Sequence, residues 1–208
     1  MAAVTPDSLA ALMGETLAPG LRIGLLGGSF NPAHEGHLHI TKEALARLGL
    51  DQVWWLVSPQ NPLKPAEGMA PIERRLETAR DIAQDPAIRV TDLESRLGTQ
   101  YSADILRELK ARGESLRFVW IMGADNFAQL PQWKDWSFMV ENVPIAVMAR
   151  TGFEEMALDR EAAGDLAKAR IPEEKAATLA NCAPPAWVYL PIPLHSGSST
   201  QVREGGKW

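Results

Sequence analysis

The chain has 208 residues, of which 46% are hydrophobic and 23% charged, a composition typical of a soluble globular domain. Its formal net charge is −5 and its basic residues are scattered, which argues against a nucleic-acid-binding surface. Cys182 is the only cysteine, so no intrachain disulfide can form and a reducing compartment fits. No apolar run reaches the length of a membrane span, and the N-terminus lacks the features of a signal peptide. We therefore expect a cytoplasmic protein with neither nucleic acid nor membrane as a partner.

Taken in chain order, residues 1–20 are expected to form an N-terminal extension with a short helix that ends near Gly14. From residue 21 onward, strand-like and helix-like segments alternate. Strands are expected at 21–27, 52–58, 88–93, 116–122, 144–150 and 186–192, and helices at 35–48, 71–84, 102–112, 125–132 and within 153–180. This alternation predicts an α/β fold, a Rossmann-like doubly wound parallel sheet with helices on both faces, in a single domain over residues 21–208.

The most informative stretch, residues 27–37, joins the first expected strand to the first long helix and reads GGSFNPAHEGH. Glycines at a strand end allow backbone N–H groups to approach a phosphate closely, and the start of a helix favours negative charge. His34 and His37 are three residues apart, so they lie on one face of the first helical turn. The stretch therefore predicts a phosphate-handling site.

Other interpretations of this stretch fit less well. A zinc-protease helix needs histidines at i and i+4, whereas these are at i and i+3 with Gly36 between them, so no metal ligands are expected. Glu35 suits the first turn because it complements the helix dipole. Gly24 and Gly27 have the wrong spacing for a dinucleotide-binding fingerprint, and no G-K-[ST] follows the glycines as a Walker A loop requires.

A second stretch near the C-terminus, residues 197–203, reads GSSTQVR. Serine or threonine caps the start of a helix, and the hydroxyls and remaining N–H groups can hold a phosphate. Arg203, one turn into that helix, supplies a forked donor. Alone, the stretch also fits an ordinary helix cap with a surface arginine. The first motif makes the phosphate role the better interpretation.

The two stretches resemble the G-G-x-F-x-P-x-H-x-G-H and S-S-T-x-x-R motifs of the nucleotidylyltransferase superfamily. Between them, in the order that the superfamily shows, lie NPLK at 61–64, YSAD at 101–104, GADN at 123–126 and PQW at 131–133. The ordered set covers about residues 21–204 and resembles the nicotinate-mononucleotide adenylyltransferase family.

The resemblance implies transfer of AMP from ATP to nicotinate mononucleotide in NAD biosynthesis, with release of pyrophosphate and with Mg²⁺ bound to ATP. It implies catalytic roles for His34, His37 and Arg203. The implied ATP-binding residues are Gly27, Gly28, Ser29, Phe30, His34, His37, Gly123, Asp125, Ser198, Ser199, Thr200 and Arg203.

The acceptor site is expected in the middle of the chain. The resemblance implies that Trp133 stacks on the pyridine ring and that the turn around Thr99 and Tyr101 receives the nicotinate carboxylate through backbone N–H groups. Asn61 joins this substrate-binding set. Lys64 and Arg75 are cations near the expected mouth of the site, where either could pair with a substrate phosphate or be a solvated surface charge.

Some alternatives stay open at this stage. Gln100 and Ser102 replace the serine and threonine that the family usually has around Tyr101, although contacts through the backbone would survive that change. A nicotinamide mononucleotide or phosphopantetheine adenylyltransferase, or a nucleotide-binding module without turnover, are the rival functions. The expected partners are ATP and nicotinate mononucleotide, and the sequence leaves open whether the chain forms a homo-oligomer.

Overall fold

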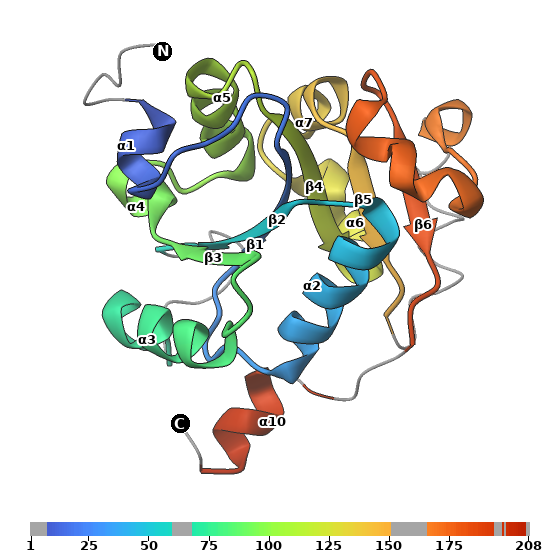
Figure 1. The fold of residues 1–208 in the computed structure, drawn as a ribbon. Coiled ribbons are helices and arrows are strands. Elements are labelled where there is room, and N and C mark those ends of the chain that lie inside the picture. Colours follow the sequence, from blue (N-terminus) through green and yellow to red (C-terminus); the bar gives the residue numbers. More distant parts are fainter. Residues whose placement is uncertain (1–7, 60–67, 151–165, 194–196, 198, 207–208) are drawn as a thin grey trace.

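In the computed structural model, residues 8–59, 68–150, 166–193, 197 and 199–206 are described. They form a six-stranded parallel sheet with the order β3-β2-β1-β4-β5-β6 (Figure 1). The strands are β1 Arg22–Gly28, β2 Gln52–Val57, β3 Ile88–Thr91, β4 Arg117–Gly123, β5 Ile145–Met148 and β6 Trp187–Leu190. All six predicted strands are confirmed, and the strand order is that of a Rossmann-like doubly wound sheet.

The α-helices are α1 Leu9–Met13, α2 Glu35–Leu48, α3 Ile72–Ile82, α4 Leu93–Arg96, α5 Ser102–Arg112, α6 Ala124–Gln129, α7 Trp136–Asn142 and α10 Ser199–Glu204. The described residues also form the 3-10 segments η1 Leu130–Gln132, η2 Ala167–Ala169 and η3 Glu173–Asn181. The helices expected at 35–48 and 102–112 are confirmed with these bounds, whereas α4 and α7 were not expected. Within the described part of the chain, no helix has the length and apolar character to cross a membrane.

Of the helix expected within 153–180, the structure describes residues 166–180 only, and Leu166 is α-helical. The 3-10 segments η2 and η3 follow it in the chain. Ala176 and Leu179 of η3 are buried against the sheet, at 4% and 0% exposure. This segment therefore contributes to the core.

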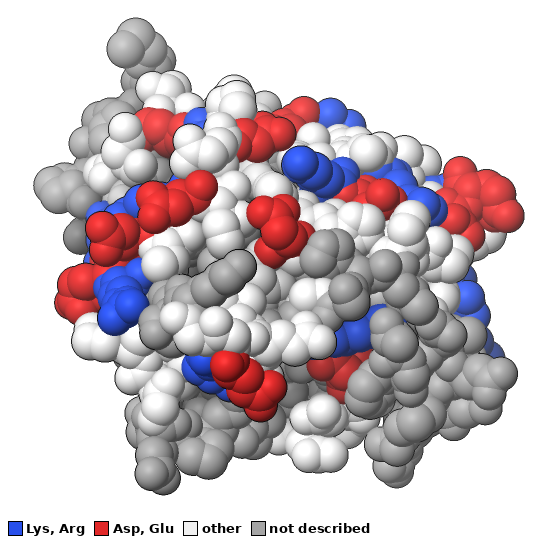
Figure 2. Space-filling model, turned by 90° about the horizontal axis from the view of Figure 1, so that it is seen from below, with Lys and Arg blue, Asp and Glu red and all other residues white. Residues whose placement is uncertain are grey.

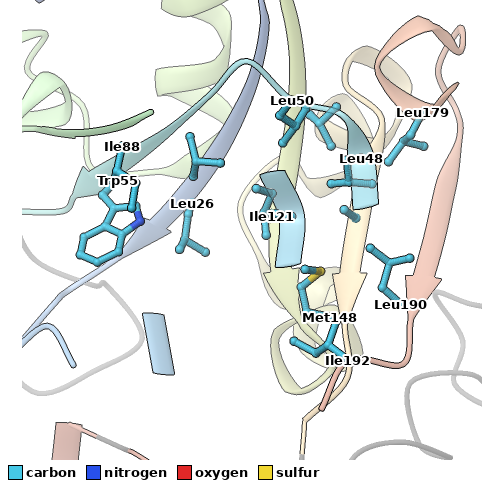
Figure 3. Close-up of a cluster of buried hydrophobic side chains, with 14 of the residues drawn as sticks. Leu26, Leu48, Leu50, Trp55, Ile88, Ile121, Met148, Leu179, Leu190 and Ile192 are labelled. Carbon is cyan, nitrogen blue, oxygen red and sulfur yellow. The ribbon is translucent and has the colours of Figure 1, made fainter. Parts of the chain in front are cut away.

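Side chains alternate between the two faces of the sheet and build two hydrophobic clusters. In β2, Trp54 packs into the cluster covered by α1, α4, α5, α6 and α7, and Trp55 into the cluster covered by α2, α3 and η3. Figure 3 shows the second cluster, to which the neighbouring strands β1, β2 and β4 contribute Leu26, Trp55 and Ile121. The expectation of helices on both faces is confirmed.

The described part of the expected N-terminal extension, residues 8–20, is packed against the rest of the domain. Leu9 of α1 is 2% exposed and belongs to the first cluster. Glu15 pairs with Arg89 at 2.9 Å, and the Gly20 N–H donates to the carbonyl oxygen of Ser115 at 2.7 Å. Residues 8–20 are thus anchored at both ends.

A crevice for ligands is expected where β1 and β4 lie side by side. The chain leaves β1 toward α2, on one face of the sheet, and leaves β4 toward α6, on the other face. Ligands of doubly wound sheets bind at the carboxyl ends of the strands at such a switch point. In Figure 1, α10 lies at the lower edge of the view, below α2.

Candidate active site

The two histidines of the first motif hold each other and the start of α2 in place. His34 is the N-cap of α2, and its Nδ1 accepts the N–H of Gly36 at 3.0 Å. Nδ1 of His37 accepts the N–H of His34 at 3.2 Å, and the two ring centroids are 4.0 Å apart. Because both Nδ1 atoms accept hydrogen bonds, the proton of each neutral ring lies on Nε2. The pair therefore presents Nε2–H donors of fixed tautomer.

Gly36, between the histidines, is a site residue that the sequence analysis did not single out. A Cβ added there would lie 2.8 Å from the ring of His34 and 3.1 Å from the carbonyl oxygen of Gly197. Any side chain would therefore displace either the imidazole or the segment that leads into α10. Its place between two functional histidines was the available sequence signal.

The aromatic rings of Phe30 and Trp55 pack next to the histidine pair. Phe30 is 1% exposed, adopts a left-handed φ of 46°, and stacks on Trp55 with 5.0 Å between ring centroids. Its ring is also 4.7 Å from that of His37. Trp55 donates from Nε1 to Thr41 Oγ1 at 2.8 Å, and that hydroxyl donates to the carbonyl oxygen of His37 at 2.8 Å. Strand β2 thus fixes both the loop and the first turn of α2.

The C-terminal helix α10 docks on the loop of the first motif. Ser199 Oγ donates to the carbonyl oxygen of Pro32 at 2.9 Å. Arg203 donates from Nη1 to the carbonyl oxygen of Asn31 at 2.6 Å and from Nη2 to Thr200 Oγ1 at 3.2 Å. The two motifs, which the sequence separates by more than 160 residues, therefore lie side by side.

Asn31 is a second residue of the first motif to which the sequence analysis gave no role. Its Nδ2 donates to the carbonyl oxygen of Gly68 at 3.0 Å, and its Oδ1 accepts the N–H of Ala70 at 3.0 Å. One residue thus joins the loop after β1, the segment before α3, and α10.

Arg75 does not lie where the sequence suggested. It is 1% exposed, and burial lowers the pKa of its guanidinium. It donates from Nε to Ala70 O at 2.9 Å, from Nη1 to Ser29 O and Ser58 O at 2.7 Å each, and from Nη2 to Pro59 O at 3.0 Å. The expectation of a substrate-facing or solvated cation is wrong, because this guanidinium holds backbone carbonyl groups in the interior.

At the end of β4, Gly123 and Asp125 are close together. A Cβ on Gly123 would lie 2.5 Å from Asp125 Oδ1, so the absence of a side chain gives this carboxylate its position. Arg150, which follows β5, pairs with Asp125 at 3.3 Å. β4 lies next to β1, so this carboxylate is on the same edge of the sheet as the first motif.

Two of the segments expected to bind the acceptor, those around Tyr101 and Trp133, lie side by side. Tyr101 is the extended N-cap of α5 and makes no side-chain cap hydrogen bond. Lys134 Nζ lies 4.4 Å above the ring of Tyr101, so the segment that follows Trp133 is beside that residue. The Thr99 N–H donates to the carbonyl oxygen of Glu94 at 2.8 Å, which fixes the turn before Tyr101.

Glu94 in α4 is a buried acid that the sequence analysis did not single out. Glu94 is only 4% exposed, and this burial raises the pKa of its carboxyl group to about 8. The carboxyl group is therefore mostly neutral at pH 7.

Three expected site residues, Asn61, Lys64 and Ser198, lie outside the described residues. Among the residues that are described, no group of three or more His, Cys, Asp or Glu side chains could hold a metal ion. Figure 2 shows the lower face of the molecule, on which the acidic and basic side chains of the described residues lie interspersed.

Residues 25–205 match the family model described as cytidylyltransferase-like. A relative from Parvibaculum lavamentivorans, named as a probable nicotinate-nucleotide adenylyltransferase, is 53% identical over 194 residues, which are 93% of this chain and 96% of that protein. A relative of the same name from Cereibacter sphaeroides is 50% identical over 186 residues, 89% of this chain and 98% of that protein.

Among solved structures, nicotinic acid mononucleotide adenylyltransferase of Plasmodium falciparum, in complex with NaAD, has a TM-score of 0.66 and 18% identity, covering 88% of this chain and 82% of that one. At this level of identity the two proteins share the fold. The match to the family model extends over most of the chain, and the two relatives align with this chain over nearly their full lengths. The chain therefore belongs to the cytidylyltransferase-like family.

Proposed function

We propose that this protein transfers the adenylyl group of ATP to nicotinate mononucleotide, giving nicotinate adenine dinucleotide and pyrophosphate in NAD biosynthesis. The observation that carries the proposal is the histidine pair: both Nδ1 atoms accept backbone N–H groups, which places the protons on Nε2 at a helix start beside the switch point. The names of the relatives support the same reaction.

The nucleophile of this reaction needs little activation by the protein. A phosphate monoester has a second pKa of about 6, so the acceptor is largely dianionic at neutral pH. One of its oxygens attacks the α-phosphorus of ATP, a new O–P bond forms, and the bond to the β-phosphate breaks with release of pyrophosphate. Catalysis then comes from positioning and from donors aimed at the developing charge. His34 and His37 supply these donors from Nε2.

The remaining ATP contacts extend from the histidines to α10. The backbone of residues 27–30 lies alongside the phosphates, and Ser198, Ser199, Thr200 and Arg203 hold the β- and γ-phosphates. Arg203 uses two of its five N–H donors on Asn31 and Thr200, so its fork can also bind an oxyanion of the leaving pyrophosphate. Gly123 and Asp125 lie against the adenosine.

The acceptor is held by the opposite part of the crevice. The indole of Trp133 stacks on the electron-poor pyridine ring, and N–H groups near Thr99 and Tyr101 receive the carboxylate. Such a site presents donors only, so the NH₂ group of nicotinamide would meet it unfavourably. Asn61 and Lys64 complete the acceptor site in this proposal, and Arg75 is no longer part of it.

Mg²⁺ is expected to enter with ATP. The side chains gathered here are hydrogen-bond donors, which fit phosphate oxygens, whereas Mg²⁺ prefers oxygen ligands and keeps several waters. The ion neutralises charge on the phosphates when bound. We place the reaction in the cytoplasm, and a homo-oligomer stays compatible with the proposal.

The proposal is tested by incubating the purified protein with ATP, Mg²⁺ and nicotinate mononucleotide. Pyrophosphate and nicotinate adenine dinucleotide should appear in equal amounts, and omission of the acceptor should abolish both. Binding of ATP without release of pyrophosphate would instead identify a nucleotide-binding module.

A further inference from the structure

We propose that Arg75 is a positioning residue for the phosphate loop: it orients the peptide between Ser29 and Phe30 so that the Phe30 N–H faces a phosphate of ATP. This inference rests on the proposed function for the identity of the ligand. It assigns to a buried arginine a role that acts through the backbone.

The geometry of the peptide sets the direction of the Phe30 N–H. Arg75 Nη1 donates to the carbonyl oxygen of Ser29 at 2.7 Å. The bond between Ser29 and Phe30 is not among the cis peptides, so its C=O and N–H point in opposite directions. Because Arg75 holds the carbonyl from the interior, the Phe30 N–H is directed away from the guanidinium.

The surroundings of that N–H group also point to a ligand. Phe30 is 1% exposed, and among the residues that the structure describes no hydrogen bond to its amide is found. Buried N–H groups are rarely left unpaired. The residues after Phe30 lead directly to the His34 and His37 pair. The Phe30 N–H is therefore placed to donate a hydrogen bond to a phosphate oxygen.

The conformation of the loop itself needs support. Phe30 has a φ of 46°, a region in which a bulky side chain is strained. Stacking on Trp55 holds the ring, and Arg75 holds the preceding carbonyl. Loss of the guanidinium would leave this peptide free to rotate toward an unstrained conformation.

The shape of the guanidinium explains why arginine is needed. One planar fork reaches the loop after β1 at Ser29, the end of β2 at Ser58 and Pro59, and the segment before α3 at Ala70. Lysine keeps the charge but has a single nitrogen, which cannot reach all of these carbonyl groups at once.

The test compares Arg75→Lys with Arg80→Lys, an identical change at an exposed position of the same helix. Three quantities are measured: the unfolding temperature, the Kd for the Mg²⁺ complex of α,β-methylene-ATP by calorimetry, and the hydrogen exchange of the Phe30 amide in the unliganded protein by NMR. Steady-state kinetics with nicotinate mononucleotide follow, well below both unfolding temperatures.

We expect Arg75→Lys to speed exchange of the Phe30 amide, to weaken analogue binding about tenfold or more, and to lower kcat with little change in the KM of nicotinate mononucleotide. Arg80→Lys should match the wild type in all of these. A purely structural role predicts a lower unfolding temperature with unchanged analogue affinity and unchanged kcat per folded molecule, and that result would overturn the proposal.

Failure of the proposed function gives a different pattern. If the wild type neither binds the analogue nor releases pyrophosphate, the adenylyl-transfer proposal is wrong. The exchange measurement then still decides whether Arg75 orients the loop, because unchanged exchange of the Phe30 amide in Arg75→Lys would refute the positioning role.

Discussion

Arg203 Nη1 donates to the carbonyl oxygen of Asn31 at 2.6 Å and thereby ties the last helix of the chain to the loop after the first strand. The side chain of Asn31 in turn binds Gly68 and Ala70. Hydrogen bonds of Asn31 therefore link the two sequence motifs and the segment before α3. Under the proposed function, this connection places the leaving-group side of the ATP site in a fixed relation to the histidine pair.

Arg203→Lys should disturb this connection without unfolding the protein. Lysine cannot donate to Asn31, Thr200 and a phosphate together, so we expect the KM for ATP to rise and kcat to fall, each about tenfold. The free energy of unfolding should change by less than about 1 kcal/mol, because Arg203 is exposed. Glu204→Gln, also exposed in α10, is the control. Unchanged kinetics in Arg203→Lys would remove Arg203 from the phosphate site.

His37→Asn separates the two roles of this histidine. The amide oxygen of asparagine can take the place of Nδ1 and accept the His34 N–H, but nothing replaces Nε2. We expect kcat to fall about 10²–10³-fold, the effect of removing one preorganised donor, with a small change in stability. His37→Ala should lose the same activity and also the cap bond, at a further cost of about 1 kcal/mol.

Kinetics and urea unfolding of both variants check this prediction, with Lys42→Ala on the exposed side of α2 as the control. Activity of either variant within about threefold of the wild type, well short of the expected loss, would show that His37 does not act on the phosphates.

Gly36→Ala should damage the site through contact alone. The added methyl group would lie 2.8 Å from the His34 ring and 3.1 Å from the carbonyl oxygen of Gly197. We expect a loss of about 1–3 kcal/mol of stability from overpacking, and a fall in kcat because the His34 ring must move. Glu35→Ala, at the exposed neighbouring position, should leave both nearly unchanged. A fully active Gly36→Ala enzyme would show that the position of His34 is not critical.

Glu94 makes stability depend on pH. Burial raises its pKa from the ordinary 4.5 to about 8, so between these values the unfolded chain releases a proton that the folded protein keeps. The stability that neutral Glu94 contributes is fully present below the pKa of the unfolded chain and is lost as pH rises through the pKa of the folded protein. Between the two pKa values, the free energy of unfolding falls with a slope approaching ~1.4 kcal/mol per pH unit.

Urea unfolding between pH 5 and pH 8.5 tests this assignment. Glu94→Gln should flatten the pH dependence and be more stable than the wild type at the upper end. Glu77→Gln, at an exposed position on α3, should retain the wild-type slope. Identical slopes for Glu94→Gln and the wild type would mean that Glu94 is ionised in the folded protein.

The parts of the fold that were predictable are those with local signals. The bounds of α2 and α5 agree with the sequence because glycine follows each C-terminus, at Gly49 and Gly113, and periodic apolar residues precede it. α7 was missed because its N-cap, Asp135, makes no side-chain cap hydrogen bond and has a left-handed φ of 52°. The strand order depends on long-range pairing and has no local signal at all.

In the candidate site, too, the predictable features are those with a local sequence signal. The histidine pair and its facing geometry followed from a three-residue spacing. The burial of Arg75 could not be predicted in this way. Four carbonyl acceptors from three separate segments surround its guanidinium, and no local sequence pattern indicates them. The structural need for Gly36 depends on Gly197, more than 150 residues away, and so also required the fold.

The proposed acceptor is tested by the ratio of kcat/KM for nicotinate mononucleotide to that for nicotinamide mononucleotide, measured with saturating ATP and Mg²⁺. A site near Tyr101 that offers donors only should favour the carboxylate by about 10²-fold or more, since the amide NH₂ would leave buried donors unpaired. A ratio near one, or a preference for the amide or for phosphopantetheine, would contradict the assignment of the acceptor.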